Sequence, residues 1–391
     1  MTNRSVFLQG YWQIVLFNFF VLSCVGLLLR YINFTGDAAY NYVFLLQAHS
    51  HFAFSAVLFL AIIGALCHAY LPITTYSYST YKIIFWLCMI ESYAMLYSFS
   101  HYGYNYISII ISTLYLFTTY FFAYFFYKNT IDLPKDTGLI TAYFSLLFLL
   151  LSSLALWGMG PLMMKGYSGK PLYFNTVYYY LHFQYNGWFS FAVLAIFIRY
   201  YDWKSVHRNI IYLLATATVL LYAISVLWCH PHTVWYIAAF IGAIVQLYCV
   251  YRFITSIAIS SFSLLSAVIY LSILCKSIIQ WLSAFPYFAD LAVANRNLII
   301  AYLHLIFIGT LFLPLYHYYR IHLSTLPHRC YRYALYLFIA TFVVTEFLMA
   351  SSIFIENMFM LRRYLFYISI LFPISILGLL FIEILSNKKI S

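Results

Sequence analysis

Charged residues are scarce in this chain, since Asp, Glu, Lys and Arg make up 7% of its 391 residues. A soluble domain carries roughly 25%, so these residues cannot cover a water-exposed surface of ordinary composition. Acidic residues are the rarer kind, with 9 Asp and Glu against 20 Lys and Arg. The basic residues are scattered through short connections and form no patch, which argues against nucleic acid as a partner.

Paired cysteines are also missing. The sequence has 7 cysteines but no C-x-x-C pair, and no C-x-x-C-H motif of the kind that attaches a c-type heme. Five of them lie in apolar segments, where cysteine packs as a small apolar residue: Cys24, Cys67, Cys88, Cys249 and Cys275. The first apolar segment has no small-residue cleavage site and is long enough to span a bilayer, so we expect no cleaved signal there.

Apolar residues make up most of what remains: 65% of the chain is hydrophobic and 23% aromatic, with 42 Tyr and 38 Phe. Aromatic rings are typical of the membrane–water interface. A spanning helix needs about 20 apolar residues, and twelve such segments lie near 10–30, 43–67, 82–101, 105–127, 139–163, 175–199, 209–229, 233–253, 262–284, 297–319, 333–354 and 364–386. We predict an all-α polytopic membrane protein in which residues 1–391 form a single twelve-helix domain.

The distribution of charge predicts the orientation. An even number of spans places both termini on one side, and most Lys and Arg residues lie in the loops on that side. The positive-inside rule assigns that side to the cytoplasm. Arg30, Arg296, Arg362 and Arg363 then lie on the outer side, at or beside helix ends. We expect an integral protein of a bacterial inner (cytoplasmic) membrane, with both termini cytoplasmic.

Several histidines lie within the apolar segments or at their ends. Those that fall toward the outer half of the membrane are His49, His51, His182, His230, His232 and His304. An ionisable residue inside a span is costly and is a functional candidate by default. Neutral imidazole is a common ligand for iron and copper, and no carboxylates accompany these histidines, which disfavours zinc or calcium. The alternative for each is a satisfied polar residue.

The tenth segment carries Tyr302 two positions before His304. Residues two apart on a helix point about 200° away from each other, so these side chains cannot serve one site. They are suited to two sites on opposite sides of one helix.

The order and spacing of these residues resemble subunit I of the heme-copper oxidases, a superfamily that includes cytochrome c oxidases, quinol oxidases and nitric oxide reductases. "QAHSHF" supplies His49 on the second segment and "AYLHLIFIG" supplies His304 on the tenth. The resemblance implies that these two histidines ligate a low-spin heme, which we expect to be b-type. "GLLLR" ends at Arg30, and "MLRRY" places Arg362 and Arg363 where the family holds heme propionates, for which a guanidinium fork is suited.

The resemblance also implies a copper site. His182 in "YLHFQYNGWF" stands at the family's sixth-helix ligand position, and His230 and His232 stand where its seventh-helix pair belongs. The family pair is adjacent, whereas Pro231 splits this one. The alternative for "CHPH" is an interfacial turn.

The chain departs from the family at the second heme. The family's H-x-H on the tenth helix reads Tyr302-Leu303-His304 here, so the usual ligand of the high-spin iron is missing. Tyrosinate can ligate heme iron, so Tyr302 either replaces that ligand or packs as an ordinary aromatic residue. The presence of a second heme is therefore open. Asn186 stands where oxidases carry a tyrosine beside copper, and Tyr185 and Tyr222 are the nearby substitutes.

Proton delivery also departs from the family. Gln184 replaces a glutamate two positions after the sixth-helix histidine. Glu91, Lys276 and Glu346 lie within apolar segments, where each is costly unless paired. They form other proton paths, or Lys276 and Glu346 form a structural ion pair.

Three functions follow from these residues. The first is a diverged oxidoreductase of the terminal respiratory class, which passes electrons from an outer donor (cytochrome c, quinol or a small copper protein) through the heme to a centre that reduces dioxygen or nitric oxide. Its other expected partners are membrane lipid and small accessory membrane subunits. The second is a non-catalytic heme protein for electron transfer, nitric oxide response or heme sensing, which the loss at Tyr302 favours. The third is a transporter with histidine proton relays, but the halves show no internal repeat.

Overall fold

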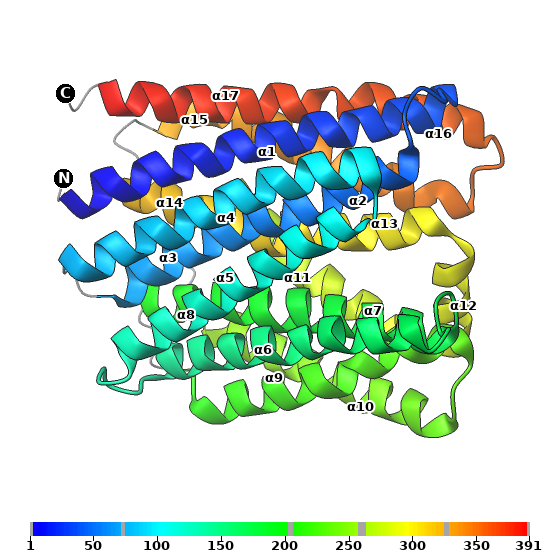
Figure 1. Cartoon of the computed structure of the whole chain (residues 1–391), viewed down its shortest axis with the longest axis horizontal. Coiled ribbons are helices and arrows are strands. Elements are labelled where there is room, and N and C mark those ends of the chain that lie inside the picture. The colour runs from blue at the N-terminus through cyan, green and yellow to red at the C-terminus, as the bar shows by residue number, and fades with distance from the viewer. Residues whose placement is uncertain (1–2, 72–74, 202–205, 257–262, 324–327, 389–391) are drawn as a thin grey trace. The chain divides into compact units, whose positions relative to one another are not determined.

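The computed structural model describes residues 3–71, 75–201, 206–256, 263–323 and 328–388, and within these ranges every regular element is a helix. Twelve helical stretches are long and apolar enough to cross a membrane, which confirms the predicted number. Their bounds differ from the predicted ones by a few residues at most ends, as in Leu8–Thr35 for the first and Met358–Leu385 for the last. Figure 1 shows the elements in chain order.

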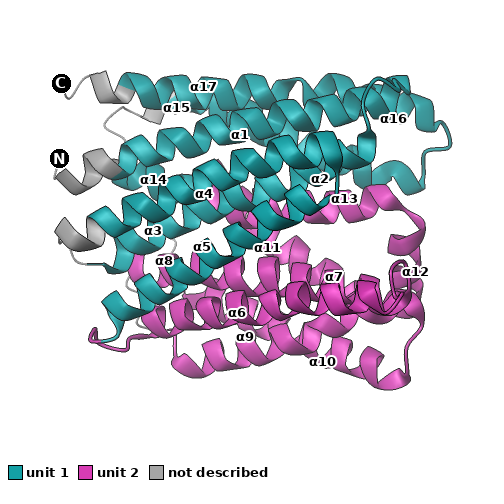
Figure 2. Cartoon of the chain, viewed as in Figure 1, with its two compact units in different colours: residues 1–131, 315–391 teal, residues 132–314 magenta. Residues whose placement is uncertain are grey.

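The chain divides into two compact units, which Figure 2 colours separately. Unit 1 comprises residues 1–131 and 315–391, and unit 2 comprises residues 132–314. The prediction of a single domain stays a prediction.

Unit 1 contains the first four spans, the end of the tenth span and the last two spans. Within it α1 packs against α2, α16 and α17, while α4 packs against α2 and α5. Its elements are α1 (Asn3–Thr35), α2 (Tyr42–Phe52), η1 (Ala53–Phe59), α3 (Leu60–Tyr70), α4 (Thr75–Tyr102), α5 (Tyr106–Thr130), most of α14 (Leu313–Leu323), α15 (His328–Ala350), η5 (Ser351–Ile353), α16 (Met358–Ser369) and α17 (Leu371–Lys388).

Unit 2 holds the intervening spans and one short helix, α12, that lies outside them. Within this unit α6 packs against α7, η2 and α8, and α11 packs against α10 and η4. Its elements are α6 (Thr137–Met164), α7 (Pro171–His182), η2 (Phe183–Phe189), α8 (Ser190–Tyr200), α9 (Arg208–Leu221), η3 (Tyr222–Cys229), α10 (Thr233–Ser256), α11 (Leu264–Ser283), α12 (Pro286–Ala294), α13 (Arg296–His304) and η4 (Leu305–Phe312).

Three spans of the described chain contain a π-helix: η1 lies within Tyr42–Tyr70, η2 within Pro171–Tyr200 and η4 within Arg296–His322. A π-helix is rare and disturbs the regular backbone ladder. For η4 the sequence gives a cause, because Pro314 follows it and has no N–H to bond the carbonyl of Thr310.

Side chains bond carbonyls in and beside the other two π-helices. Asn18 on α1 donates to the carbonyl of Ala56 at 2.9 Å, and Tyr319 on α14 donates to that of Ala61 at 2.6 Å. In η2 the Ser190 hydroxyl donates to the carbonyl of Tyr185 at 2.6 Å. Such partners are needed because no water in a bilayer core can bond these groups.

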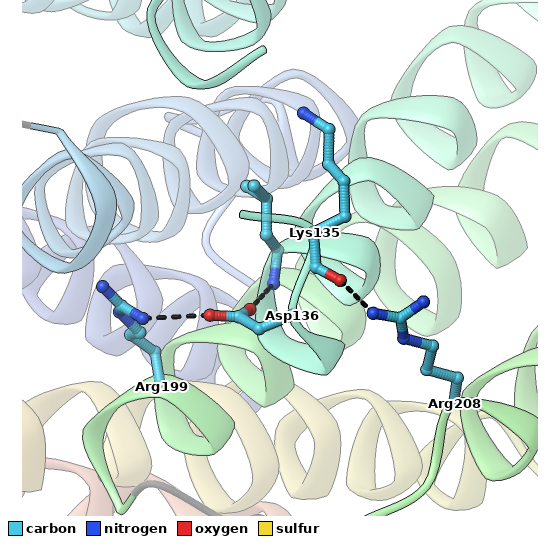
Figure 3. A network of polar contacts seen from close by, with 5 residues as sticks. Lys135, Asp136, Arg199 and Arg208 are labelled. Atoms are coloured by element: carbon cyan, nitrogen blue, oxygen red, sulfur yellow. Dashed lines mark hydrogen bonds and ion pairs between the residues drawn. The ribbon is translucent and has the colours of Figure 1, made fainter. Parts of the chain in front are cut away.

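Basic side chains gather at one end of unit 2 (Figure 3). Asp136 caps α6 by accepting from the Leu139 amide at 2.7 Å, and it pairs with Arg199 at the end of α8 at 2.9 Å. Arg208 at the start of α9 donates to the carbonyl of Lys135. The α5–α6 and α8–α9 connections, which the predicted topology places on the inner side, therefore meet at one end of this unit.

A close contact between α6 and η2 generates a prediction about the stability of unit 2. A Cβ added to Gly187 would lie 2.6 Å from the Cβ of Phe148, whereas one added to Gly158 on α6 would meet nothing within 4 Å. We expect Gly187→Ala to lower the free energy of unfolding by about 1–3 kcal/mol, because the two helices must move apart. We expect Gly158→Ala to raise it by about 0.5–1 kcal/mol through helix propensity.

Chemical denaturation of the two variants in detergent measures both changes. Equal stability of the two variants would contradict the packing described for η2.

Candidate functional site

His49 lies in the last turn of α2, just ahead of η1, and is half-buried. Its ring packs edge-on against α1, since a Cβ added to Gly26 would lie 3.1 Å from Cε1 and 3.7 Å from Nδ1. An alanine at this position would require the ring to shift by a few tenths of an ångström. The Cε1–Nδ1 edge therefore faces α1, and Nε2 is the nitrogen farther from it.

His51, on the same helix, has a structural role. Its ring stacks on Phe99 with centroids 4.1 Å apart, and its Nε2 lies 3.0 Å from the Tyr104 hydroxyl. The neighbouring histidine is thus held against α4, while His49 lies against α1.

Arg30 follows Gly26 by about one turn of α1. Its guanidinium lies 2.8 Å from the Met349 sulfur on α15, and its charge interacts with Glu346 on the same helix. A carboxylate beside an arginine lowers the cost of holding either charge within a span. Glu346, which the sequence offered as a partner for Lys276, is thus placed beside Arg30.

Arg362 and Arg363 lie on α16, which packs against α1. Both are exposed, and the Arg363 guanidinium lies 5.8 Å from the ring of Tyr367. They are therefore on a helix next to the one that carries Gly26 and Arg30.

His182 is the last residue of α7, directly ahead of η2, and is fully buried. Its Nε2 lies 2.8 Å from the carbonyl of Thr218 and its Nδ1 lies 3.2 Å from the side-chain nitrogen of Asn186. A carbonyl can only accept, so Nε2 carries the proton and Nδ1 accepts from Asn186. Both ring nitrogens are thus occupied by protein partners in a neutral imidazole.

Aromatic residues surround His182 within unit 2. The ring of Tyr222 lies 6.0 Å from the His182 ring and that of Tyr185 lies 6.5 Å away. Tyr302 on α13 is close enough to Tyr185 for the two to interact electrostatically. The structure therefore brings together the three tyrosines that the sequence singled out with one histidine, and we call His182, Tyr185, Tyr222 and Tyr302 the His182 cluster.

Lys276 is a buried cation beside this cluster. It lies within electrostatic range of His182 and is 8% exposed. It shares one face of α11 with two other buried polar residues, Ser272 and Gln280. Gln280 accepts a hydrogen bond from Gln246 on α10 at 2.9 Å. Polar residues thus extend along this side of α11 inside unit 2.

The other two predicted copper ligands lie apart from His182. The 3-10 helix η3 ends at Cys229, His230 adopts a left-handed conformation with φ 50°, and Pro231 follows. His230 is exposed, with its Nε2 4.0 Å from a carboxylate oxygen of Asp290, and His232 is exposed as well. Among the described residues no group of three or more His, Cys, Asp or Glu side chains is placed to hold a metal ion. The split by Pro231 turns the pair outward, so this arrangement does not fit a copper ion.

His304 ends α13, directly ahead of η4, and is half-buried. His49, His182 and His304 therefore share one local setting, at or near the end of an α-helix that continues as a π-helix. The π-helices were not predicted. Pro314 after η4, and the polar residues Asn18 and Ser190 within apolar segments, were the signals that could have indicated them.

Glu91 is the remaining acidic candidate within a span. It accepts a hydrogen bond from the Thr118 hydroxyl at 2.9 Å, between α4 and α5. It lies in unit 1, where α4 also carries Phe99 against His51.

A comparison of the chain with protein-family models and with curated proteins finds no match.

The contacts of His182 generate a prediction about stability. We expect His182→Phe to lower the free energy of unfolding by about 1–3 kcal/mol, because it leaves the Thr218 carbonyl and the Asn186 amide without their buried partner. His232→Phe is the matched control, since an exposed histidine is expected to change stability by less than about 0.5 kcal/mol.

Denaturant titration in detergent gives both values. A His182→Phe protein as stable as the His232→Phe protein would show that the His182 hydrogen bonds contribute little.

Proposed function

We propose that the chain is a membrane heme protein of electron transfer, similar to subunit I of the heme-copper oxidases, in which His49 and His304 are the axial ligands of one low-spin, b-type heme. One observation carries the proposal. His49, His182 and His304 lie in three different spans, and these are the described spans that contain a π-helix. π-Helices occur frequently at functional sites. Such an irregularity beside each of three costly histidines is expected of a cofactor site.

The surroundings of His49 fit an axial ligand. The ring is held edge-on against Gly26, so that its orientation is fixed and Nε2 is the nitrogen directed away from α1. His51 cannot take this role, because Phe99 and Tyr104 hold its ring. A bound heme would supply reversible one-electron chemistry, with its potential set by the axial ligands and by nearby charge.

Charges on α1 and α16 support an anionic cofactor. Arg30 lies on α1 one turn beyond Gly26, and Arg362 and Arg363 are exposed on the adjacent α16. Guanidinium groups bind carboxylates such as propionates through paired hydrogen bonds. We assign Arg362 and Arg363 to the propionates, and Arg30, with Glu346 beside it, to the electrostatic setting of His49.

The contacts of His182 favour electron transfer over catalysis at a copper centre. Both nitrogens of His182 bond to protein groups, and a metal would have to displace Thr218 or Asn186. We therefore do not include copper in the proposed electron-transfer function. Electron transfer, nitric oxide response or heme sensing is supported better than reduction of a substrate at a copper centre.

A terminal oxidoreductase that reduces dioxygen or nitric oxide is the second candidate. The observation in its favour is that η2 follows His182 directly, with Tyr185, Tyr222 and Tyr302 nearby. It would need a second heme, with Tyr302 in place of the missing histidine, and a rearrangement that brings His230 and His232 inward. Its electron donor would be a cytochrome c, a quinol or a small copper protein.

The membrane setting is part of the proposal. The twelve apolar helices make the chain an integral membrane protein. We infer cytoplasmic termini in a bacterial inner membrane, which the gathering of Lys135, Arg199 and Arg208 at one end of unit 2 supports. Lipid, and small membrane subunits, are the expected neighbours.

The ligand assignment predicts a loss of heme. We expect His304→Ala to lower heme per chain at least about tenfold, because loss of a metal ligand costs more than the 10–100-fold seen for outer-shell partners. The exposed His101 on α4 gives the matched control, His101→Ala, which should keep its heme. Heme is measured by pyridine hemochromogen spectra of the purified proteins. Undiminished heme in the His304→Ala protein would end the assignment of His304.

Carbon monoxide and metal analysis separate the two candidates. Electron transfer through one six-coordinate heme predicts reduced spectra that carbon monoxide does not change, with no copper that depends on His182. The oxidoreductase predicts a carbon monoxide-sensitive second heme and copper that is lost in His182→Phe. Spectra recorded with and without carbon monoxide, together with elemental analysis, show which holds.

A further inference from the structure

Asn18 on α1 is a fully buried amide, 0% exposed, whose side chain is bonded at both ends. Its Nδ2 donates to the carbonyl of Ala56 at 2.9 Å and lies 3.1 Å from the Met89 sulfur. Its Oδ1 accepts from the Tyr93 hydroxyl at 3.0 Å. A polar side chain this deep in a span is costly unless satisfied, and this one joins α1, η1 and α4.

The bond to Ala56 is the one that bears on local backbone structure, since Ala56 lies in the middle of η1. Where an α-helix passes into a π-helix, the bonding pattern changes and carbonyls lose their usual partners. In a bilayer no water can replace them. Asn18 supplies a donor from outside the helix, and Tyr319 supplies a second at Ala61, just beyond η1.

The form of η1 determines how α2 is rotated relative to α3. An α-helix turns about 100° per residue, and a π-helix takes up about one more residue per turn. Conversion of η1 to a regular α-helix would therefore turn α2 by roughly 100° relative to α3. His49 would then leave its place against Gly26.

We propose that Asn18 is a positioning residue, which holds η1 as a π-helix and thereby fixes the orientation of the His49 ring. The inference rests on the proposed function only where it treats His49 as a heme ligand. The local part, that Asn18 maintains η1, stands independently of any cofactor.

The test compares two variants. Asn18→Leu keeps the approximate size of the residue and removes its contacts with Ala56, Met89 and Tyr93. Tyr93→Phe is the matched control, because it removes the donor to Asn18 and leaves the bond to Ala56 in place. Both are studied as the full chain, in detergent and with whatever heme the purified protein carries.

Two readouts are needed. Amide hydrogen exchange of peptides covering residues 53–60 reports on η1 without reference to heme, and we expect Asn18→Leu to exchange at least about tenfold faster, as expected from the loss of a buried hydrogen bond. Electron paramagnetic resonance reports the angle between two axial imidazoles through the largest g value of the oxidised heme. We expect that g value to shift in Asn18→Leu and to stay in place in Tyr93→Phe.

Unchanged amide exchange in Asn18→Leu, or an equal increase in Tyr93→Phe, would contradict the proposal that Asn18 maintains η1 through Ala56. Faster exchange with an unchanged g value would contradict the proposal that Asn18 fixes the orientation of His49. A wild-type protein with no heme would contradict the proposed function. The exchange data would still test whether Asn18 maintains η1. If Asn18→Leu does not accumulate, Asn18→Ser is used, because its shorter side chain cannot reach Ala56 and the same two shifts are expected.

Discussion

The backbone carbonyls inside the membrane are the constraint on which the rest of this structure depends. A regular α-helix bonds them internally, but the spans carrying His49, His182 and His304 are interrupted by π-helices. Side chains then supply the donors: Asn18 at Ala56, Ser190 at Tyr185 and Tyr319 at Ala61. These contacts give polar residues within apolar segments a structural role, and they tie the settings of His49 and His182 to the packing of their units.

The same constraint governs charge. Arg30 lies beside Glu346 and the Met349 sulfur, and Glu91 accepts from Thr118. In unit 2 no acidic residue lies within the described spans, and Lys276 lies within electrostatic range of the neutral His182. Both ring nitrogens of the neutral His182 bond to protein groups, at Thr218 and Asn186, so neither nitrogen is available to a metal ion. This is the physical reason to separate the heme proposed at His49 and His304 from the catalytic centre that the resemblance would imply at His182.

Much of the fold could be predicted from the sequence, because a spanning helix is specified by composition and length. The twelve spans were found this way, and so were the buried or half-buried positions of His49, His182 and His304. The short helix α12 and the π-helices were not predicted, since no periodic pattern marks them and their partners come from distant segments, as Asn18 does for Ala56. The structure groups Tyr185, Tyr222 and Tyr302 near His182, and the catalytic roles of these tyrosines stay a prediction. The outward turn of His230 was not predicted, because the left-handed backbone before Pro231 depends on how η3 ends.

The central claim is that His49 and His304 are the two axial ligands of one low-spin heme. Near-infrared magnetic circular dichroism of the oxidised wild-type protein tests it most directly, because the energy of the charge-transfer band identifies the pair of axial ligands. The bis-histidine assignment predicts the band of paired imidazoles, at one heme per chain. The band of an imidazole with a tyrosinate would assign Tyr302 instead, and the absence of any heme band would contradict the claim outright.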